Sequence, residues 1–241
     1  MLSGSGVIKR FGGLTALLNV DFNVKEGEIV GLIGPNGSGK TTLFNVISGF
    51  YRPDSGTITF KGKEIVGLKP HEIAKLGIGR TFQIVRPFED LTTLENVAVG
   101  ALYGRAGIND IVRAKREALK FLEFMGLADK KDILARDLTL AERKRLELAR
   151  ALVIKPELLL LDEVFAGLNP AETKDATGLI FRIRDELGVT VFMIEHVMKT
   201  IMETCKRIMV LHHGHKIAEG KPEEVAHDPA VISAYLGVKY A

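Results

Sequence analysis

The residues best suited to chemistry in this sequence form a glycine-rich stretch, GPNGSGKT, at positions 34–41. The stretch has the spacing G-x-x-x-x-G-K-[ST] and stands between a segment typical of a strand and one typical of a helix. Glycines let the backbone wrap around a phosphate, so that successive N–H groups and the helix N-terminus point at the anion. We expect Lys40 to contact the β- and γ-phosphates and the Thr41 hydroxyl to ligate Mg²⁺. The residues predicted to surround the nucleotide here are Asn36, Gly37, Ser38, Gly39, Lys40, Thr41 and Thr42.

A second candidate site lies in ELLLLDEVFAG, residues 157–167. An apolar strand that ends on Asp162 suits the Mg²⁺-associated carboxylate of P-loop enzymes. Glu163 follows at once and would face the place from which water attacks the γ-phosphate. Taken singly, the two motifs could be a glycine-rich turn and a pair of surface acids. Together in one chain they favour binding and hydrolysis of a nucleoside triphosphate.

The elements that must position these residues alternate between short apolar strands and helices, which is typical of a buried parallel sheet. β-rich segments come first, and the pattern is helical from about residue 93 to 153. We therefore predict an α/β fold of mainly parallel sheet with an inserted helical subdomain, and the family that the motifs of this chain resemble implies a P-loop NTPase core with an antiparallel β subdomain. The expected boundaries are a single domain over 1–241, with the core at 1–83 and 154–241 and the insertion at 84–153.

The composition of the chain argues against several classes of protein. The chain has 241 residues and a formal net charge of +3, and its basic residues are interleaved with acidic ones, which argues against nucleic acid as a partner. A single cysteine rules out an internal disulfide. We find no run of about 18 apolar residues and no secretory signal, so a membrane role would require docking through a partner.

Several further motifs make the sequence resemble the ATP-binding subunits of ABC transporters over nearly its whole length. The resemblance places Gln83, in TFQ, at the Q-loop, which contacts Mg²⁺ and water and senses the transmembrane partner. It places His196, in IEHVM, at the switch histidine that holds the γ-phosphate, and AGLNP (166–170) at the D-loop. Phe11 falls where an aromatic ring stacks on adenine. His196 and Phe11 also have simpler interpretations, as a strand-end histidine and a core aromatic.

Longer stretches resemble one branch, the branched-chain amino-acid importer ATPases. They are RTFQIVRPFEDLTTLENVAVG (80–100), DEVFAGLNP (162–170) and IAEGKPEEVAHDPAVISAYLG (217–237). This resemblance implies ATP and Mg²⁺ as ligands and a peripheral position on the cytoplasmic face of the cell membrane. It implies a second ATPase subunit, identical or paralogous, and transmembrane permease subunits docked near residues 83–100. An extracytoplasmic solute-binding protein would be an indirect partner.

One motif departs from the family pattern. Where the family usually has LSGGQ, this chain has LTLAE at 138–142. In the family this signature contacts the ATP held by the partner subunit, which assigns Thr139 and Ala141 to the nucleotide. From the residues alone, Thr139 and Glu142 form a capping box that begins a helix running to about Lys155. The predicted buried stripe is Leu146, Ala149, Leu152 and Val153, with Arg143, Glu147 and Arg150 outside and Arg143 paired with Glu147.

Two alternative functions stay open at the level of the sequence. The divergent signature is compatible with an ATP-dependent dimerisation module of weak or no hydrolysis, although Glu163 and His196 argue against it. A soluble ABC ATPase that acts on nucleic acid is disfavoured, because the chain has no heptads and no cysteine cluster. HHGHK (212–216) is expected to be a hairpin surface, with His212 and His213 on opposite faces and therefore a poor metal site.

Overall fold

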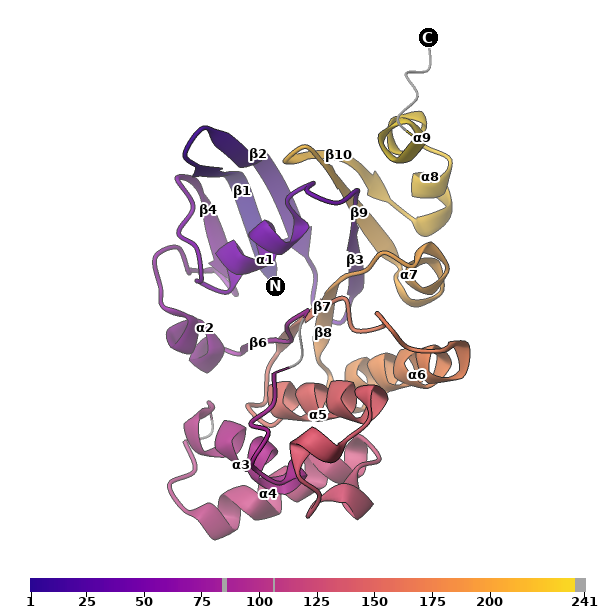
Figure 1. The fold of residues 1–241 in the computed structure, drawn as a ribbon. Coiled ribbons are helices and arrows are strands. Elements are labelled where there is room, and N and C mark those ends of the chain that lie inside the picture. Colours follow the sequence, from indigo (N-terminus) through magenta and orange to yellow (C-terminus); the bar gives the residue numbers. More distant parts are fainter. Residues whose placement is uncertain (84–85, 106, 237–241) are drawn as a thin grey trace. The chain divides into compact units, whose positions relative to one another are not determined.

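The structure, a computed structural model, describes residues 1–83, 86–105 and 107–236 (Figure 1). The chain divides into two compact units, one formed by Met1–Ile73 with Thr190–Ala241 and the other by Ala74–Val189. The boundary at residue 73 falls inside helix α2 (Pro70–Leu76). The predicted insertion at 84–153 stays a prediction, and its first residues, 84 and 85, lie outside the described residues.

The first unit contains an antiparallel sheet in the order β2-β1-β4-β5. Its strands are β1 (Leu2–Phe11), β2 (Leu14–Val24), β4 (Ser55–Phe60) and β5 (Lys63–Glu64). Alternate side chains of β2, including Val20, Phe22 and Val24, are buried, as expected for a sheet with one covered face. This is the predicted antiparallel β subdomain.

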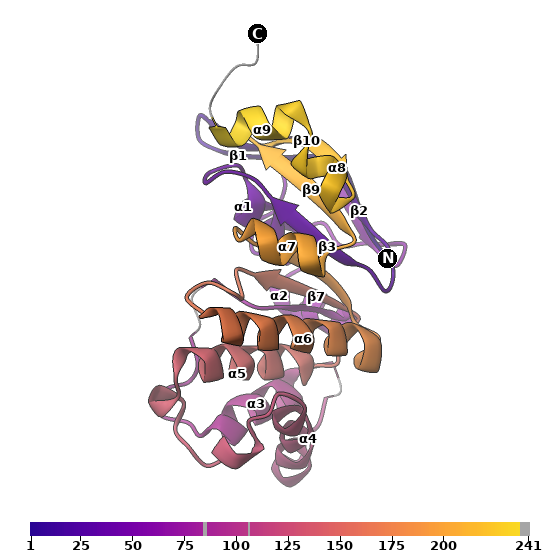
Figure 2. The ribbon, with the colours of Figure 1, turned by 90° about the vertical axis from the view of Figure 1, so that its right-hand side faces the viewer.

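The same unit holds β3 (Ile29–Ile33), which pairs in parallel with both β8 (Thr190–Ile194) and β9 (Arg207–His212). All residues of β3 and β8 are buried. Phe44 of α1 (Lys40–Ile47) packs edge-on against Phe192 of β8 at 5.0 Å between ring centroids. Helix α7 (Met198–Thr204) lies beside β3 (Figure 2), and its Ile201 is close to Gly31 of that strand. Helices therefore cover the parallel strands, as the apolar pattern predicts.

The end of the chain completes this unit. Strand β10 (His215–Gly220) pairs antiparallel with β9, followed by α8 (Pro222–Ala226) and α9 (Pro229–Leu236). The expectation that His212 and His213 point to opposite faces is wrong, because their rings lie 4.1 Å apart between centroids. Strand β9 ends at His212 and the chain turns at His213, whose φ is 45°, so strand alternation no longer holds there.

The second unit pairs β6 (Ile78–Arg80) in parallel with β7 (Leu158–Asp162). Its main helices are α3 (Thr93–Tyr103), α4 (Ile111–Phe124), α5 (Leu140–Leu152) and α6 (Pro170–Leu187). Short 3₁₀ turns lie at Ala128–Lys130 and Ala135–Asp137. Helices α3, α4 and α5 pack on one another, as Figure 1 shows. Within the described ranges, no helix is both long and apolar enough to cross a membrane.

The prediction for the opening of α5 is confirmed, and the prediction for its surface is partly wrong. Thr139 Oγ1 accepts from the Glu142 N–H at 3.3 Å, and the Glu142 carboxylate accepts from the Thr139 N–H at 2.9 Å. The predicted buried stripe is buried. The helix ends at Leu152, before the expected Lys155. Arg143 donates to the carbonyls of Leu138 and Arg136 and does not pair with Glu147, whose role is described below.

Candidate nucleotide site

The loop at 34–39 has a backbone that only glycine adopts easily at three of its positions. Gly34, Gly37 and Gly39 have φ values of 149°, 76° and 106°. A Cβ on Gly34 would lie 2.0 Å from the Leu211 carbonyl oxygen, and one on Gly39 would lie 2.5 Å from that of Ala16. The spacing found in the sequence is therefore imposed both by conformation and by close contacts of the backbone.

Lys40 begins α1 and is folded back over this loop. Its ammonium donates to the carbonyls of Gly34 at 2.8 Å and Pro35 at 3.0 Å, and the residue is only 6% exposed. The first turn of α1 carries no acidic residue, so the positive end of the helix dipole is not offset there. The loop therefore presents a buried cation and a helix N-terminus in the arrangement that suits a phosphate.

The other predicted residues of this loop differ in exposure. Asn36, Gly37 and Thr41 are exposed, Thr42 is half-buried, and Ser38 is buried. His196, in the same unit, is an exposed residue that follows β8 directly after the buried Glu195. The exposed residues among these are accessible to a ligand.

Phe11 ends β1 and is 41% exposed. Its ring contacts Tyr51 edge-on at 5.1 Å between centroids, and the Lys9 ammonium lies 5.2 Å from the ring centre. Phe11 is therefore not a core aromatic. Its contact with adenine stays a prediction, and Tyr51 is an aromatic neighbour that the sequence pattern did not reveal.

In the second unit, Asp162 ends β7 and is 2% exposed. Arg80, at the end of the neighbouring β6, places Nη2 3.3 Å from Asp162 Oδ2. The Asp162 N–H also donates to Thr81 Oγ1 at 3.2 Å. No cluster of three His, Cys, Asp or Glu side chains suited to a metal occurs among the described residues. The carboxylate of Asp162 is an oxygen ligand of the kind that Mg²⁺ prefers.

Glu163 is half-buried and has a φ of 53°, which is uncommon for a residue with a side chain. Gln83 Nε2 donates to Glu163 Oε2 at 2.9 Å, and Lys144 Nζ donates to the Glu163 carbonyl at 3.2 Å. The structure thus brings together two of the predicted catalytic residues, Gln83 and Glu163. Arg80 and Lys144 were not predicted, since each contacts a residue far away in the sequence.

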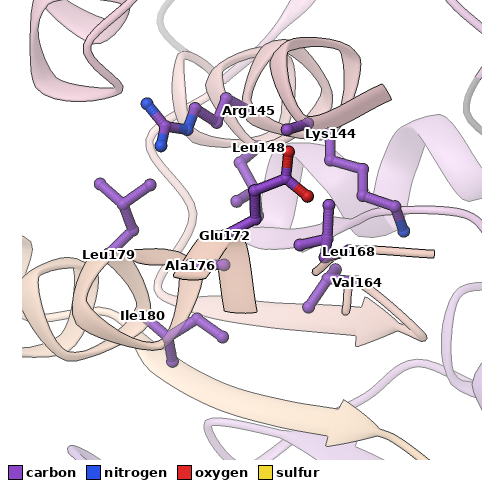
Figure 3. Close-up of a pocket in the computed structure, with 10 residues that line it drawn as sticks. Lys144, Arg145, Leu148, Val164, Leu168, Glu172, Ala176, Leu179 and Ile180 are labelled. Atoms are coloured by element: carbon purple, nitrogen blue, oxygen red, sulfur yellow. The ribbon is translucent and has the colours of Figure 1, made fainter. Parts of the chain in front are cut away.

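The segment that replaces the usual signature has regular helical geometry. Thr139 is the exposed N-cap of α5, and Ala141 lies in its first turn without a positive φ. A small cavity of about 20 Å³, enough for roughly one water, is lined by Lys144 and Leu148 of α5 and by Glu172 and Ala176 of α6 (Figure 3). Ala141 also lines it. The cavity is too small for a nucleotide. The N-terminus of α5 is capped by Thr139 and Glu142 and is exposed at Thr139.

Comparison with known proteins defines the class. The sequence profile of the family described as "ABC transporter" matches residues 17–166, and that described as "Branched-chain amino acid ATP-binding cassette transporter" matches residues 215–241. Since the first match covers more than half of the chain, the protein belongs to the ATP-binding subunits of ABC transporters. It binds nucleotide and is an ATPase, with the α/β fold predicted for that class.

The similarity to individual proteins extends over nearly the whole of each chain. The "High-affinity branched-chain amino acid transport ATP-binding protein" LivG of Salmonella typhimurium is 44% identical, over 98% of both chains. The protein of the same description from Pseudomonas aeruginosa, BraF, is 43% identical, again over 98% of both chains. Among solved structures, the ADP conformation of MJ1267, an ATP-binding cassette of an ABC transporter, has a TM-score of 0.89 at 32% identity over 99% of both chains. The dimeric bacterial ABC transporter cassette MJ0796 has a TM-score of 0.83 at 28% identity, over 92% of this chain and 99% of that one.

Proposed function

We propose that this chain hydrolyses ATP to drive an importer of branched-chain amino acids. The observation that carries the proposal is the similarity to LivG and BraF over 98% of both chains, and the P-loop, over which the buried Lys40 ammonium is folded, supports it. The chain would act as a peripheral subunit on the cytoplasmic face of the membrane, docked on permease subunits through residues near 83–100.

We propose the following roles at the nucleotide. Lys40 and the loop N–H groups hold the phosphates, and His196 contacts the γ-phosphate. Glu163 accepts a proton from the attacking water, which Gln83 helps to orient. Phe11 stacks on adenine. No covalent intermediate on the protein is needed, because phosphoryl transfer depends mainly on positioning and charge stabilisation.

Mg²⁺ would be held by Thr41, Gln83 and Asp162. When bound it offsets negative charge on the phosphate oxygens, which favours attack by water. The position of Asp162 at the end of the apolar strand β7 supports its part in this assignment.

The second ATPase subunit, identical or paralogous, would present Thr139 and Ala141 to the ATP bound by the first. The N–H groups of the first turn of α5 that the capping box leaves unbonded supply the attraction, against the negative charge of Glu142 in the same turn, and replacing a signature glycine by Ala141 removes no N–H. The exposed N-cap and regular first turn of α5 support this contact. An extracytoplasmic solute-binding protein would complete the importer, and no nucleic acid takes part.

The importer proposal is tested by uptake in the organism that carries this gene. Deletion should reduce uptake of labelled leucine, isoleucine and valine and leave uptake of arginine unchanged. The wild-type gene should restore uptake and the Glu163→Gln variant should not. Unchanged leucine uptake in the deletion strain would contradict the importer role. Full restoration by Glu163→Gln would instead favour a dimerisation module that needs no hydrolysis.

A further inference from the structure

One face of α5 carries three charged side chains, Lys144, Glu147 and Arg150, spaced three residues apart. Residues at this spacing lie on the same side of a helix. Each of them bonds to backbone outside the helix: Lys144 to Glu163, Glu147 to Phe82, which precedes Gln83, and Arg150 to Arg86, three residues after Gln83. We refer to these three residues as the α5 stripe.

Glu147 is the centre of the stripe. Its Oε1 accepts from the Phe82 N–H at 2.7 Å, which is the distance of a strong bond to a charged acceptor. Burial raises the pKa of Glu147, although the Phe82 N–H and the charges of Arg150 and Lys144 act in the opposite direction. Phe82 directly precedes Gln83, so this bond holds the backbone from which the Gln83 side chain reaches Glu163.

Lys144 bonds to Glu163, the second residue of the contact between Gln83 and Glu163. The residue is only 8% exposed, and its ammonium donates to the Glu163 carbonyl at 3.2 Å. Glu163 has a left-handed backbone, which costs about 1–2 kcal/mol for a residue with a side chain. A bond to its carbonyl oxygen stabilises that conformation and fixes the direction in which the carboxylate leaves the chain.

Arg150 extends the stripe beyond Gln83. Its Nη1 donates to the Arg86 carbonyl at 3.1 Å, and its guanidinium carbon lies 5.0 Å from the centre of the Phe88 ring. Burial lowers the pKa of Arg150, while the charge of Glu147 opposes that change. The stripe therefore contacts the chain on both sides of Gln83.

We propose that the α5 stripe consists of positioning residues that set the geometry of Gln83 and Glu163 for hydrolysis. Because α5 is one continuous helix, a contact of Thr139 with a partner's nucleotide would reach Glu147 over about 12 Å at 1.5 Å per residue. The inference rests on the proposed roles of Gln83 and Glu163. It adds that Glu147, which acts through the Phe82 backbone, determines how well they work.

The test compares Glu147→Ala with Glu147→Gln in the purified full chain. Glutamine keeps an oxygen that accepts from the Phe82 N–H, whereas alanine removes it. Two quantities are measured: hydrogen exchange of the peptide that contains Phe82 without nucleotide, and kcat with ATP affinity from a fluorescent ATP analogue. Glu123→Ala, at an exposed position of α4, is the matched control and should change neither.

We expect Glu147→Ala to exchange faster at Phe82 and to lose about tenfold to a hundredfold in kcat, the range that a small misplacement of catalytic groups produces. Its ATP affinity should stay within about twofold, since the P-loop backbone is untouched. Glu147→Gln should restore most of the kcat and most of the protection of the Phe82 N–H from exchange. Lys144→Met should lower kcat and leave exchange at Phe82 unchanged, and it serves as the test if Glu147→Ala does not fold.

Three results would overturn the inference. In the first, Glu147→Ala has the same exchange at Phe82 and the same kcat as the wild type. In the second, Glu147→Ala exchanges faster at Phe82 but keeps its kcat. In the third, Glu147→Gln loses as much kcat as Glu147→Ala. Glu163→Gln is measured alongside. If that variant hydrolyses ATP normally, the proposed role of Glu163 fails, while the exchange data still decide whether Glu147 holds the chain beside Gln83.

Discussion

The buried ion pair between Arg80 and Asp162 leads to the most demanding prediction about stability. The two side chains are 7% and 1% exposed, and their charged atoms lie 3.3 Å apart. Replacing Arg80 by Met keeps similar volume and removes the cation, so that a buried carboxylate loses this neighbour. Removing one member of a buried pair costs about 3–5 kcal/mol, because the remaining charge stays out of water.

The assay is urea unfolding followed by circular dichroism at 222 nm, since the chain contains no tryptophan. With a slope of about 2 kcal/mol per molar urea, the predicted loss lowers the midpoint of Arg80→Met by about 1.5–2.5 M. In a protein that already carries Asp162→Asn, Arg80→Met should lower the free energy of unfolding far less, because no buried negative charge is left behind. Equal losses in both backgrounds would refute the reasoning.

Three further predictions concern other parts of the chain. Thr139→Ala removes the cap of α5 and should lower the free energy of unfolding by about 1 kcal/mol, measured by urea unfolding; a change near zero would contradict the capping box. Gly37→Ala meets no atom within 4 Å and should cost only backbone strain, whereas Gly39→Ala would clash with a backbone oxygen and should lose far more ATP affinity in a fluorescence titration; equal affinities would contradict this. Hydrogen bonds from Lys120 and Lys155 lower the pKa of Glu117 to about 2, so its stabilising effect is complete above the unfolded pKa near 4.5 and is lost as pH falls toward 2. In Glu117→Gln the free energy of unfolding should fall less between pH 6 and pH 2 than in the wild type. An unchanged pH profile would contradict the lowered pKa of Glu117.

The features predictable from the sequence are those that short segments determine. The P-loop requires glycines at fixed offsets, and the structure gives Gly34, Gly37 and Gly39 the positive φ values that explain them. The capping box of Thr139 and Glu142 depends on residues three apart, and it forms as expected. The apolar run before Asp162 likewise sufficed to place that carboxylate at a strand end.

Contacts between distant residues were not predictable from spacing. The local rule for residues four apart paired Arg143 with Glu147, but Glu147 accepts from the backbone N–H of Phe82, 65 positions away, because the fold brings the two segments together. Arg80 and Asp162 are 82 positions apart and meet because their strands, β6 and β7, run in parallel. Such pairs depend on which strands become neighbours, and strand order is a property of the whole fold.

The central claim, that this chain hydrolyses ATP with Glu163 in a site completed by a second subunit, is tested most directly by Mg-ATP hydrolysis against protein concentration. We predict a specific rate that rises with concentration in the wild type and is abolished in Glu163→Gln, with ATP binding retained in both. ATP binding without turnover by the wild type at any concentration would contradict a homodimeric site. Turnover that persists in Glu163→Gln would contradict the role assigned to Glu163.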